Sequence, residues 1–484
     1  MGGETGGDTG GDTGGERGSK RGDERGAAAG GAAEAVTARL AAFVAQADAG
    51  AIPEAVLHEG RRCLVNLFGV ALHATQDPAL PMLLDVLQAE GGRPRATVIG
   101  VGRRVPLMHA ALANGLLAHL DDFDDTFFPT VLHPSAPTIP AALALAEDRG
   151  TDGRSFLAAT VLGLEACCRV ALSIQQMRHG ALWHMTGTAG VFGSAAAAGR
   201  LLGLDASTMA VAFGLAGTQA GGLRETFGTM TKAFHPARAA QSGLLAALMA
   251  QRGFSSTTRI LEGPHGFAQA FAAGAFDAEA IVDGLGERWL LMDNAPKPYA
   301  SAILSHPMVD AMLALRTQPG VSPAQVVRIG GRVNPLAIRL ESRPEPADGL
   351  AARLSFQHAM AAAFVDGTCL PAQFTDARVH DPVVAGVRRS IEMTPDPAMP
   401  QHGCEVELSL ADGRVLRQAI EHATGSPGRP VSDVQLEAKF LALAGTVLPA
   451  ARARRLLGQL WQVDWLPDVG VLLRACRRSP RLLR

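Results

Sequence analysis

Long apolar segments punctuated by glycine and proline dominate residues 33–294 of the chain. Segments 106–120, 139–147 and 156–172 are rich in alanine and leucine, and several of them carry apolar residues almost all round a helical projection. That distribution is typical of helices buried on more than one side. The pattern therefore predicts a large all-helical domain that begins near residue 33.

The pattern changes after residue 294. Residues 326–333 and 404–420 alternate between apolar and polar side chains as strands do, with a turn predicted at Asp412 and Gly413. A helical pattern returns over 432–445. These changes predict a smaller α+β domain inserted before the chain rejoins the helices.

The first 32 residues repeat glycine with acidic residues and threonine and hold no apolar run. Such a composition cannot offset its ordering entropy, and it is no secretory signal. The predicted fold class is mainly α. The predicted organisation is a disordered tail (1–32), the first part of a helical domain (33–294), an inserted smaller α+β lid domain (295–431) and a C-terminal return to the helical domain (432–484).

Charge and cysteine content narrow the cellular context. The chain carries 44 basic and 46 acidic side chains, which leaves no excess of cations to bind nucleic acid. The longest uncharged candidate for a membrane span, 206–223, consists mostly of small residues that suit helix packing. Six cysteines without paired spacing favour a reducing compartment. We therefore expect a cytoplasmic protein with no nucleic-acid or membrane partner.

Lysine and tyrosine are unusually scarce. The chain holds one tyrosine, Tyr299, and four lysines among its 44 basic residues, namely Lys20, Lys232, Lys297 and Lys439. Because arginine replaces lysine wherever any cation suffices, the remaining lysines are expected where a compact, titratable ammonium is needed.

The densest polar segment spans residues 118–140. It contains four aspartates within five positions, followed by a threonine and a histidine: Asp121, Asp122, Asp124, Asp125, Thr126 and His133. On a helix end Asp121 and Asp125 would share one face, as would Asp122 and Thr126. So many like charges need cations, a metal or helix N-termini nearby. The alternative is a solvated helix end with capping aspartates.

Three other segments carry candidate chemistry. His184 precedes a glycine-rich helix whose N-terminus could bind a carboxylate, although glycines also serve close packing. Lys232 and His235 would share one face of a helix, where one could bind a carboxylate and the other could transfer a proton. The alternative is a solvated basic turn.

Lys297, Tyr299 and His306 gather where the helical domain meets the inserted one, a favoured place for ligand sites. The alternative is a proline-containing linker before a helix that begins at Pro307.

Common cofactor motifs are absent from the sequence. It holds no HExxH, CxxC, GxSxG or P-loop pattern, and its 14 histidines show no metal-ligand spacing. DDFDD matches the DDxxD pattern of magnesium-dependent isoprenoid synthases, which remains a remote alternative. A second aspartate-rich motif is missing, and 5% aromatic residues are few for a carbocation pocket.

Several segments, in family order from about residue 35 to 445, resemble the MmgE/PrpD family. They are DFDDT followed by HPSA, WHMTGTAG, MTKAFHPARAA, ILEGPHGF (260–267), KPY with SHPMVDA, RLSFQHAMAAAFVDG (353–367) and GSPGRPVSDVQLEAKF (425–440). The resemblance implies a helical domain with an α+β lid, a homodimer, and catalysis without an organic cofactor or obligatory metal in the cleft between the domains.

The resemblance also implies a set of site residues. The expected catalytic residues are Asp122, Thr126, His133, His184, Lys232 and His306. A position that is often tyrosine in the family's decarboxylases falls on His358. The further substrate-binding candidates are Lys297, Tyr299 and His235.

The family's reactions share a proton transfer beside a carboxylate. Here the histidine motif reads HPSAPTIP and not the HPSDN-like form of 2-methylcitrate dehydratases. Decarboxylation or dehydration of a small di- or tricarboxylic acid is expected, with epimerisation of an imino- or amino-dicarboxylate as the alternative and a binding protein without catalysis as a further one. We expect His133, oriented by Asp122, to act as base and His184 or His306 as acid, while Lys232 holds a carboxylate.

Overall fold

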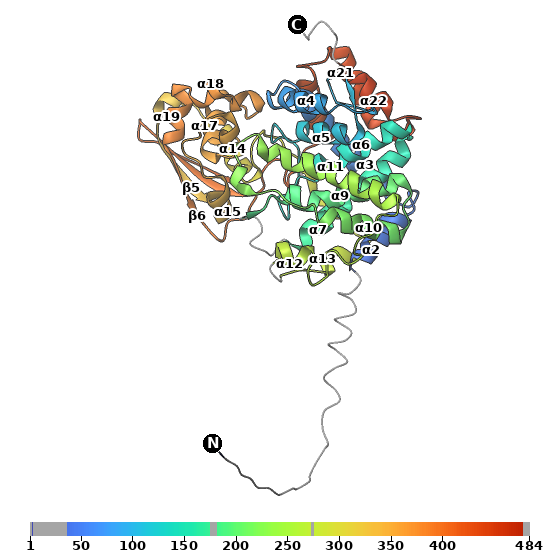
Figure 1. Ribbon diagram of the computed structural model, residues 1–484. Helices are drawn as coiled ribbons and strands as arrows, with labels where there is room; N and C mark the ends of the chain where they lie inside the picture. Colours follow the sequence, from blue (N-terminus) through green and yellow to red (C-terminus); the bar gives the residue numbers. More distant parts are fainter. Residues whose placement is uncertain (1, 3–35, 175–181, 273–274, 478–484) are drawn as a thin grey trace.

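The computed structural model describes residue 2 and residues 36–174, 182–272 and 275–477 of the chain. The predicted tail, residues 1–32, lies outside these residues except for Gly2. Two parts lie side by side, a helical part drawn in blue to green and a part in yellow to orange that contains strands (Figure 1). The predicted fold class, mainly α with a smaller α+β part, is confirmed.

Three long helices of the helical part, Ser135–Arg149, Gly153–Ser173 and Met185–Leu202, pack closely against one another. A Cβ atom on Gly193 would lie 2.5 Å from Thr138 Oγ1 and 2.9 Å from the carbonyl oxygen of Gly163, so glycine permits this approach. The helices of this part are α2 (Val36–Gln46), α3 (Glu54–Ala74), α4 (Ala79–Glu90), α5 (Leu107–Leu117), α6 (Ser135–Arg149), α7 (Gly153–Ser173), α9 (Met185–Leu202), α10 (Ala206–Gly217), α11 (Thr231–Gln251), α12 (Phe267–Ala272) and α13 (Glu279–Val282).

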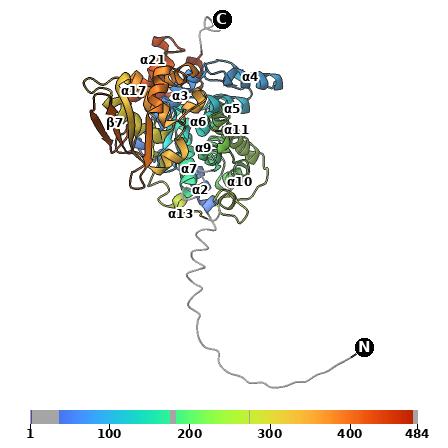
Figure 2. The same ribbon diagram turned by 90° about the vertical axis from the view of Figure 1, so that its left-hand side faces the viewer.

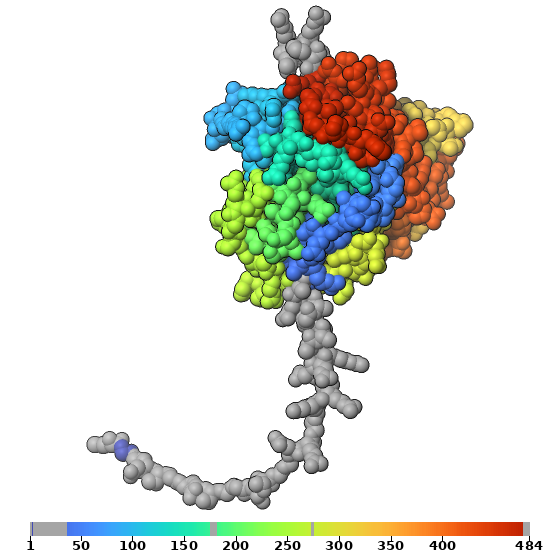
Figure 3. Space-filling view, turned by 90° about the vertical axis from the view of Figure 1, so that its right-hand side faces the viewer, coloured from blue at the N-terminus to red at the C-terminus, as the bar shows by residue number. Residues whose placement is uncertain are grey.

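The C-terminal segment returns to the helical part. The helix predicted over 432–445 is α20 (Asp433–Ala444), whose N-terminus is closed by a capping box between Ser432 and Gln435. Both α20 and the following α21 (Ala450–Trp461) pack against α3, and α22 (Gly470–Ala475) packs against α21 (Figures 1 and 2). The red C-terminal segment lies among the blue and teal segments in the space-filling view (Figure 3).

The second part contains a four-stranded sheet in the order β6-β5-β7-β8. The strands are β5 (Val326–Val333), β6 (Ile391–Pro395), β7 (Cys404–Leu410) and β8 (Val415–Ile420). β5 pairs in parallel with β6 and antiparallel with β7, which pairs antiparallel with β8. The predicted turn is present, since Gly413 has φ +87° and Arg414 N–H donates to Asp412 Oδ1 at 3.0 Å.

The second part also contains helices, namely α14 (His306–Leu315), α15 (Pro335–Glu341), α16 (Gly349–Ala352), α17 (Phe356–Asp366), α18 (Asp376–Val379) and α19 (Pro382–Arg389). Of these, α14 and α15 pack against the sheet and α17 packs on α14. The predicted helix start near Pro307 is confirmed, because α14 begins at His306 with proline in its first turn. Along β7 alternate side chains are buried, from Cys404 to Leu410, and α14 covers β7 and β8.

Short strands and 3-10 helices complete the fold and join its parts. The strands are β1 (Ala96–Thr97), β2 (Arg104–Val105), β3 (Asp125–Phe127) and β4 (Asn294–Pro296). The 3-10 helices are η1 (Arg224–Thr226), η2 (Leu290–Asp293), η3 (Ile303–Ser305), η4 (Pro323–Gln325), η5 (Pro371–Phe374) and η6 (Val463–Trp465). β3 pairs antiparallel with β4, which fixes the aspartate-rich segment beside the start of the second part.

Buried apolar side chains form two clusters. The first joins helices α2 to α13 with α20 to α22, and the second runs from Ala300 to Leu410 with Val70, Phe123 and Leu443. Within the described ranges one helix, α7, is long and apolar enough to cross a membrane by length and composition, but 89% of the window that qualifies is buried inside the protein. All six cysteines are buried free thiols.

Candidate active site

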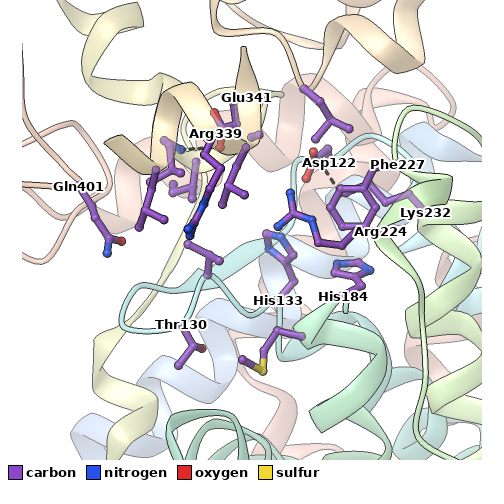
Figure 4. A pocket seen from close by; sticks show the side chains of 18 of the residues that line it. Asp122, Thr130, His133, His184, Arg224, Phe227, Lys232, Arg339, Glu341 and Gln401 are labelled. Atoms are coloured by element: carbon purple, nitrogen blue, oxygen red, sulfur yellow. Dashed lines mark hydrogen bonds and ion pairs between the residues drawn. The ribbon is translucent and has the colours of Figure 1, made fainter. Parts of the chain in front are cut away.

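A cavity of about 220 Å³ lies where the helical part faces α15 and η3 of the second part (Figure 4). Its charged and titratable lining comes from both sides. The helical part supplies Asp122, His133, His184, Arg224 and Lys232, and the second part supplies Arg339 and Glu341. Ligand sites commonly lie between two such parts, so this cavity is the candidate active site.

The aspartate-rich segment does not form a helix end, which corrects the expectation of shared helical faces. α5 ends at Leu117, turns follow, and Asp125 begins β3. Each of the four carboxylates is buried and has partners of its own. Asp121 accepts from Arg353 Nη2 at 3.0 Å and lies 2.6 Å from His73 Nδ1. The four carboxylates are tolerated side by side because each has its own hydrogen-bond or ion-pair partners. Those of Asp121 and Asp122 are distant in sequence, whereas Asp124 is held by the nearby His119.

Two lysines hold Asp122. Its Oδ1 lies 2.6 Å from Lys297 Nζ and its Oδ2 3.1 Å from Lys232 Nζ. The backbone carbonyl of Asp122 also accepts from Lys297 at 3.0 Å, with the residue at φ +50°, a left-handed conformation that aspartate tolerates. Burial opposes ionisation of Asp122, but the two ammonium groups hold its pKa well below the usual range.

His133 lies in the loop between β3 and α6. Its Nδ1 is 2.7 Å from the carbonyl oxygen of Asp125 and 3.2 Å from Thr126 Oγ1. Because a carbonyl only accepts, Nδ1 carries the proton and Nε2 of the neutral ring is free to accept one. Burial, helped by Lys297, lowers the pKa of His133 to about 3. The backbone of Asp125 and the hydroxyl of Thr126 orient this ring, and not Asp122 as expected, because Asp122 is held by the lysines.

His119 links the aspartate-rich segment to Lys232. Its Nδ1 is 2.7 Å from Asp124 Oδ2, and its Nε2 is 3.0 Å from Lys232 Nζ. An ammonium only donates, so Nε2 accepts and Nδ1–H donates to Asp124. Burial lowers the pKa of His119 and of Lys232, while Asp124 and Asp122 respectively oppose the shift.

His184 is the N-cap residue of α9, as the glycine-rich pattern suggested, and Met185 of the first turn lines the cavity. Its Nδ1 lies 3.1 Å from Nδ1 of His235, which shares α11 with Lys232. Burial first, then His119 and Lys232, lowers the pKa of His184 well below the usual range. The cavity is therefore lined by two neutral imidazoles and a helix N-terminus.

The remaining expected residues do not line the cavity. Lys297 and Thr126 act from behind it, through Asp122 and His133. His306 is fully buried, with Nε2 3.2 Å from the carbonyl oxygen of Ser301 and its ring 5.2 Å from that of Tyr299. Tyr299 donates to Asp310.

His358 lies in α17, away from this cavity. Its Nε2 donates to the carbonyl oxygen of Gln373 at 2.8 Å, which leaves Nδ1, 3.4 Å from Arg388 Nη1, to accept. Its immediate partners thus belong to the second part.

The structure corrects the expectation that the histidines lack a metal-ligand arrangement. Ring nitrogens of His119, His133 and His184 lie within 4.8 Å of one another, as do ligand atoms of His119, Asp122 and Asp124. The Lys232 ammonium is within 3.1 Å of both His119 and Asp122, so it competes with a cation for these groups.

The remote alternative of a magnesium-dependent isoprenoid synthase does not fit this geometry. Of the four aspartates only Asp122 lines the cavity described above, and its oxygens face Lys232 and Lys297. Diphosphate-bound magnesium needs carboxylate oxygens free to coordinate it.

Two family models match the chain. The MmgE/PrpD N-terminal domain matches residues 38–279, and the MmgE/PrpD C-terminal domain matches residues 299–462. The chain belongs to the MmgE/PrpD family. Similar proteins include the cis-aconitate decarboxylases of Mus musculus and Homo sapiens, each 26% identical over 440 residues, which is 87% of this chain and 89% and 90% of theirs. That of Aspergillus terreus is 27% identical over 409 residues, 78% of this chain and 82% of its own.

The predicted enzyme class, a lyase of the MmgE/PrpD type, is thereby confirmed. Sequence reasoning about this MmgE/PrpD chain missed other polar groups in or beside the cavity: His119, Arg224, Arg339 and Glu341. It named Asp124 only as one of the four clustered aspartates. His119 had one local signal, its place directly before the aspartates in AHLDDFDD. Arg224 and Arg339 had no such local signal, because the sequence contains many arginines.

Proposed function

We propose that this MmgE/PrpD lyase decarboxylates a small unsaturated tricarboxylic acid of the cis-aconitate type, without an organic cofactor or obligatory metal. One observation carries the proposal: the cavity surrounds two neutral imidazoles with three cationic side chains, Lys232, Arg224 and Arg339. Among the described lining residues, Asp122 is the carboxylate whose pKa is held low, and it is already paired with Lys232 and Lys297. A substrate with several carboxylates complements the positive charge of the three cationic side chains.

The cations on opposite sides of the cavity position the substrate. Lys232 lies in α11 and Arg224 in η1, whereas Arg339 lies in α15 (Figure 4). Carboxylates bound to these groups would hold the reacting carbon between the two sides. The N-terminus of α9 after His184 adds amide dipoles that favour an anion.

The reaction needs one proton and releases carbon dioxide. The bond between a carbon and its carboxylate breaks, carbon dioxide leaves, and the electron pair remains on carbon, where the neighbouring double bond delocalises it. A proton then adds to carbon. Bound carboxylates place negative charge beside His133 and His184, which raises their pKa values and allows one of them to carry that proton.

Lys232 favours catalysis without a metal. Its ammonium lies 3.0 Å from His119 Nε2 and 3.1 Å from Asp122 Oδ2, the atoms that a cation would have to share. The positive charge that a metal would supply to a carboxylate or carbanion is then supplied by Lys232 itself.

We also propose a cellular location, an oligomeric state and domain boundaries for this protein. The six buried free thiols support a cytoplasmic location, and the family resemblance supports a homodimer without nucleic-acid or membrane partners. The two apolar clusters support domain boundaries near 294/295 and 431/432. Light scattering on the purified protein tests the dimer, which should show twice the chain mass of 50.3 kDa.

A substrate panel tests the reaction. Release of carbon dioxide is measured with cis-aconitate, 2-methylcitrate, citrate and iminodisuccinate, each at several concentrations. We expect release from cis-aconitate alone. Loss of water from a hydroxy acid would instead make the protein a dehydratase, and inversion of iminodisuccinate without gas would make it an epimerase, so either result would overturn decarboxylation.

A further inference from the structure

Glu341, at the end of α15, brings a carboxyl group to the cavity from the side opposite His133 and His184 (Figure 4). The residue is 5% exposed. Its Oε1 accepts the backbone N–H of Leu304 at 3.0 Å. Its Oε2 is buried and has no hydrogen-bond partner among the described residues. A buried polar atom beside a cavity and without a protein partner points to a group on the ligand.

Burial, more than the neighbouring charges, sets the pKa of Glu341. Burial raises the pKa of Glu341 to about 8, and Asp122 adds to this shift. The backbone amides of Leu304 and Ser305 and the ammonium of Lys297 oppose the shift without cancelling it. Arg224 and Arg339 also line the cavity, and Arg224 interacts electrostatically with Glu341 without removing the effect of burial on that carboxyl. The elements packed on α15 add little, because η3 offers backbone amides and Glu392 of β6 is exposed.

We propose that Glu341 is a substrate-binding residue that stays protonated and donates a hydrogen bond from Oε2 to a carboxylate of the bound acid. Oε1 is the acceptor of the Leu304 N–H, so Oε2 is the oxygen that carries the proton. A neutral acid also preserves the positive charge of the cavity, which an ionised Glu341 would reduce. This inference rests on the proposed substrate class, an acid with several carboxylates.

The proposal makes substrate binding depend on pH in a defined way. Below pH 8 the carboxyl donates, and above it the ionised group repels the substrate carboxylate it should bind. The KM of the wild-type protein should therefore rise about tenfold per pH unit above pH 8, with a smaller change in kcat.

Two variants test the role of the proton. In E341Q the amide keeps a donor but cannot ionise, so the rise of KM above pH 8 should disappear. In E341L the donor is lost, and KM at pH 7 should rise about tenfold or more. Glu392→Gln, an exposed site on β6, is the matched control. The same pH dependence of KM in wild type and E341Q would overturn the proposal, as would a loss of kcat without a change of KM in E341Q.

Thermal stability gives a readout that needs no turnover. Glu341 binds a proton more tightly in the folded protein than in the unfolded chain, so its contribution to stability is lost as the pH rises from about 5 to 8. The melting temperature of E341Q relative to wild type should rise over that range. A constant difference would contradict the protonated state even if no tested acid were a substrate, whereas a wild type without turnover would contradict only the proposed function.

Discussion

At the scale of single residues, the scarce lysines mark the site. Lys232 and Lys297 pair with Asp122, and Lys439 donates to Asn66 Oδ1 at 2.7 Å and lies 3.6 Å from the centre of the Phe123 ring. All three surround the aspartate-rich segment, while Lys20 lies outside the described residues. These three lysines thus lie where a compact ammonium has several close acceptors, as their scarcity led us to expect. An ammonium fits between closely spaced acceptors where a planar guanidinium would not.

Lys232 is expected to bind a substrate carboxylate directly. Lys232→Met should lower kcat/KM by roughly 100-fold or more, because the variant removes a cation from a largely buried site. Arg238→Met is the matched control, since Arg238 is an exposed cation on the same helix, and it should stay close to wild type. Comparable losses in both variants would mean that the charge of α11, and not the position of Lys232, matters.

His306 is expected to affect stability through pH. Burial and Lys297 lower its pKa to about 3, so below pH 6.5 the unfolded chain takes up a proton that the folded protein refuses. Stability is thus lost as the pH falls, by about 1.4 kcal/mol per pH unit. Melting temperatures at pH 7, 6 and 5 should show His306→Gln gaining on wild type. A melting temperature of His306→Gln that stayed at a constant offset from wild type, or fell further below it, as the pH dropped would contradict a neutral buried ring.

At the scale of elements, the local pattern predicted helices and strands better than it predicted the conformation of the aspartate-rich segment. Helices α5, α6 and α7 and strands β5, β7 and β8 appear where the sequence pattern placed them. The helices are buried on most sides and β7 buries alternate side chains, so local sequence is enough to predict them. The segment 121–125 was predicted as a helix end. It forms turns and a short strand because Lys297, Arg353 and β4, all far away in sequence, supply its partners.

Distant partners also explain which site groups escaped notice. His119 becomes a site residue only through Lys232, more than a hundred positions later. Arg339 and Glu341 reach the cavity only because α15 packs beside η3. Conversely, His184 and Lys232 were predictable, since one precedes a glycine-rich helix and the other is a rare lysine.

Close helix packing in this scaffold depends on glycine at particular positions. A Cβ on Gly243 of α11 would lie 2.4 Å from Ser194 Cβ and 2.6 Å from the Val191 carbonyl oxygen, so backbone would have to move. Gly243→Ala should destabilise the protein by about 1–3 kcal/mol in denaturant unfolding. Gly458 of α21 faces open space, and Gly458→Ala should stabilise by about 0.5–1 kcal/mol. Equal effects would contradict this account of α9 and α11.

At the scale of the whole molecule, the site exists only because the two parts meet. The helical part supplies His133, His184 and Lys232, whereas the second part supplies Arg339 and Glu341. The chain leaves the helical part before the second part and returns to it afterwards, because α20 and α21 pack on α3. Both ends of the second part are therefore attached to the helical part. Substrates with carboxylates at both ends could thus be bound from two sides, which suits selection among acids that differ by one carboxylate.

Proton NMR in D2O tests the central claim most directly. Protein treated with EDTA is incubated with cis-aconitate, beside His133→Gln as the matched variant. The account predicts loss of one carboxylate and a product with one deuterium on carbon, at a rate at least about 100-fold lower in His133→Gln. Unchanged spectra with the wild type, activity that returns only when a divalent metal is added, or a full rate in His133→Gln would contradict metal-free proton chemistry at this site.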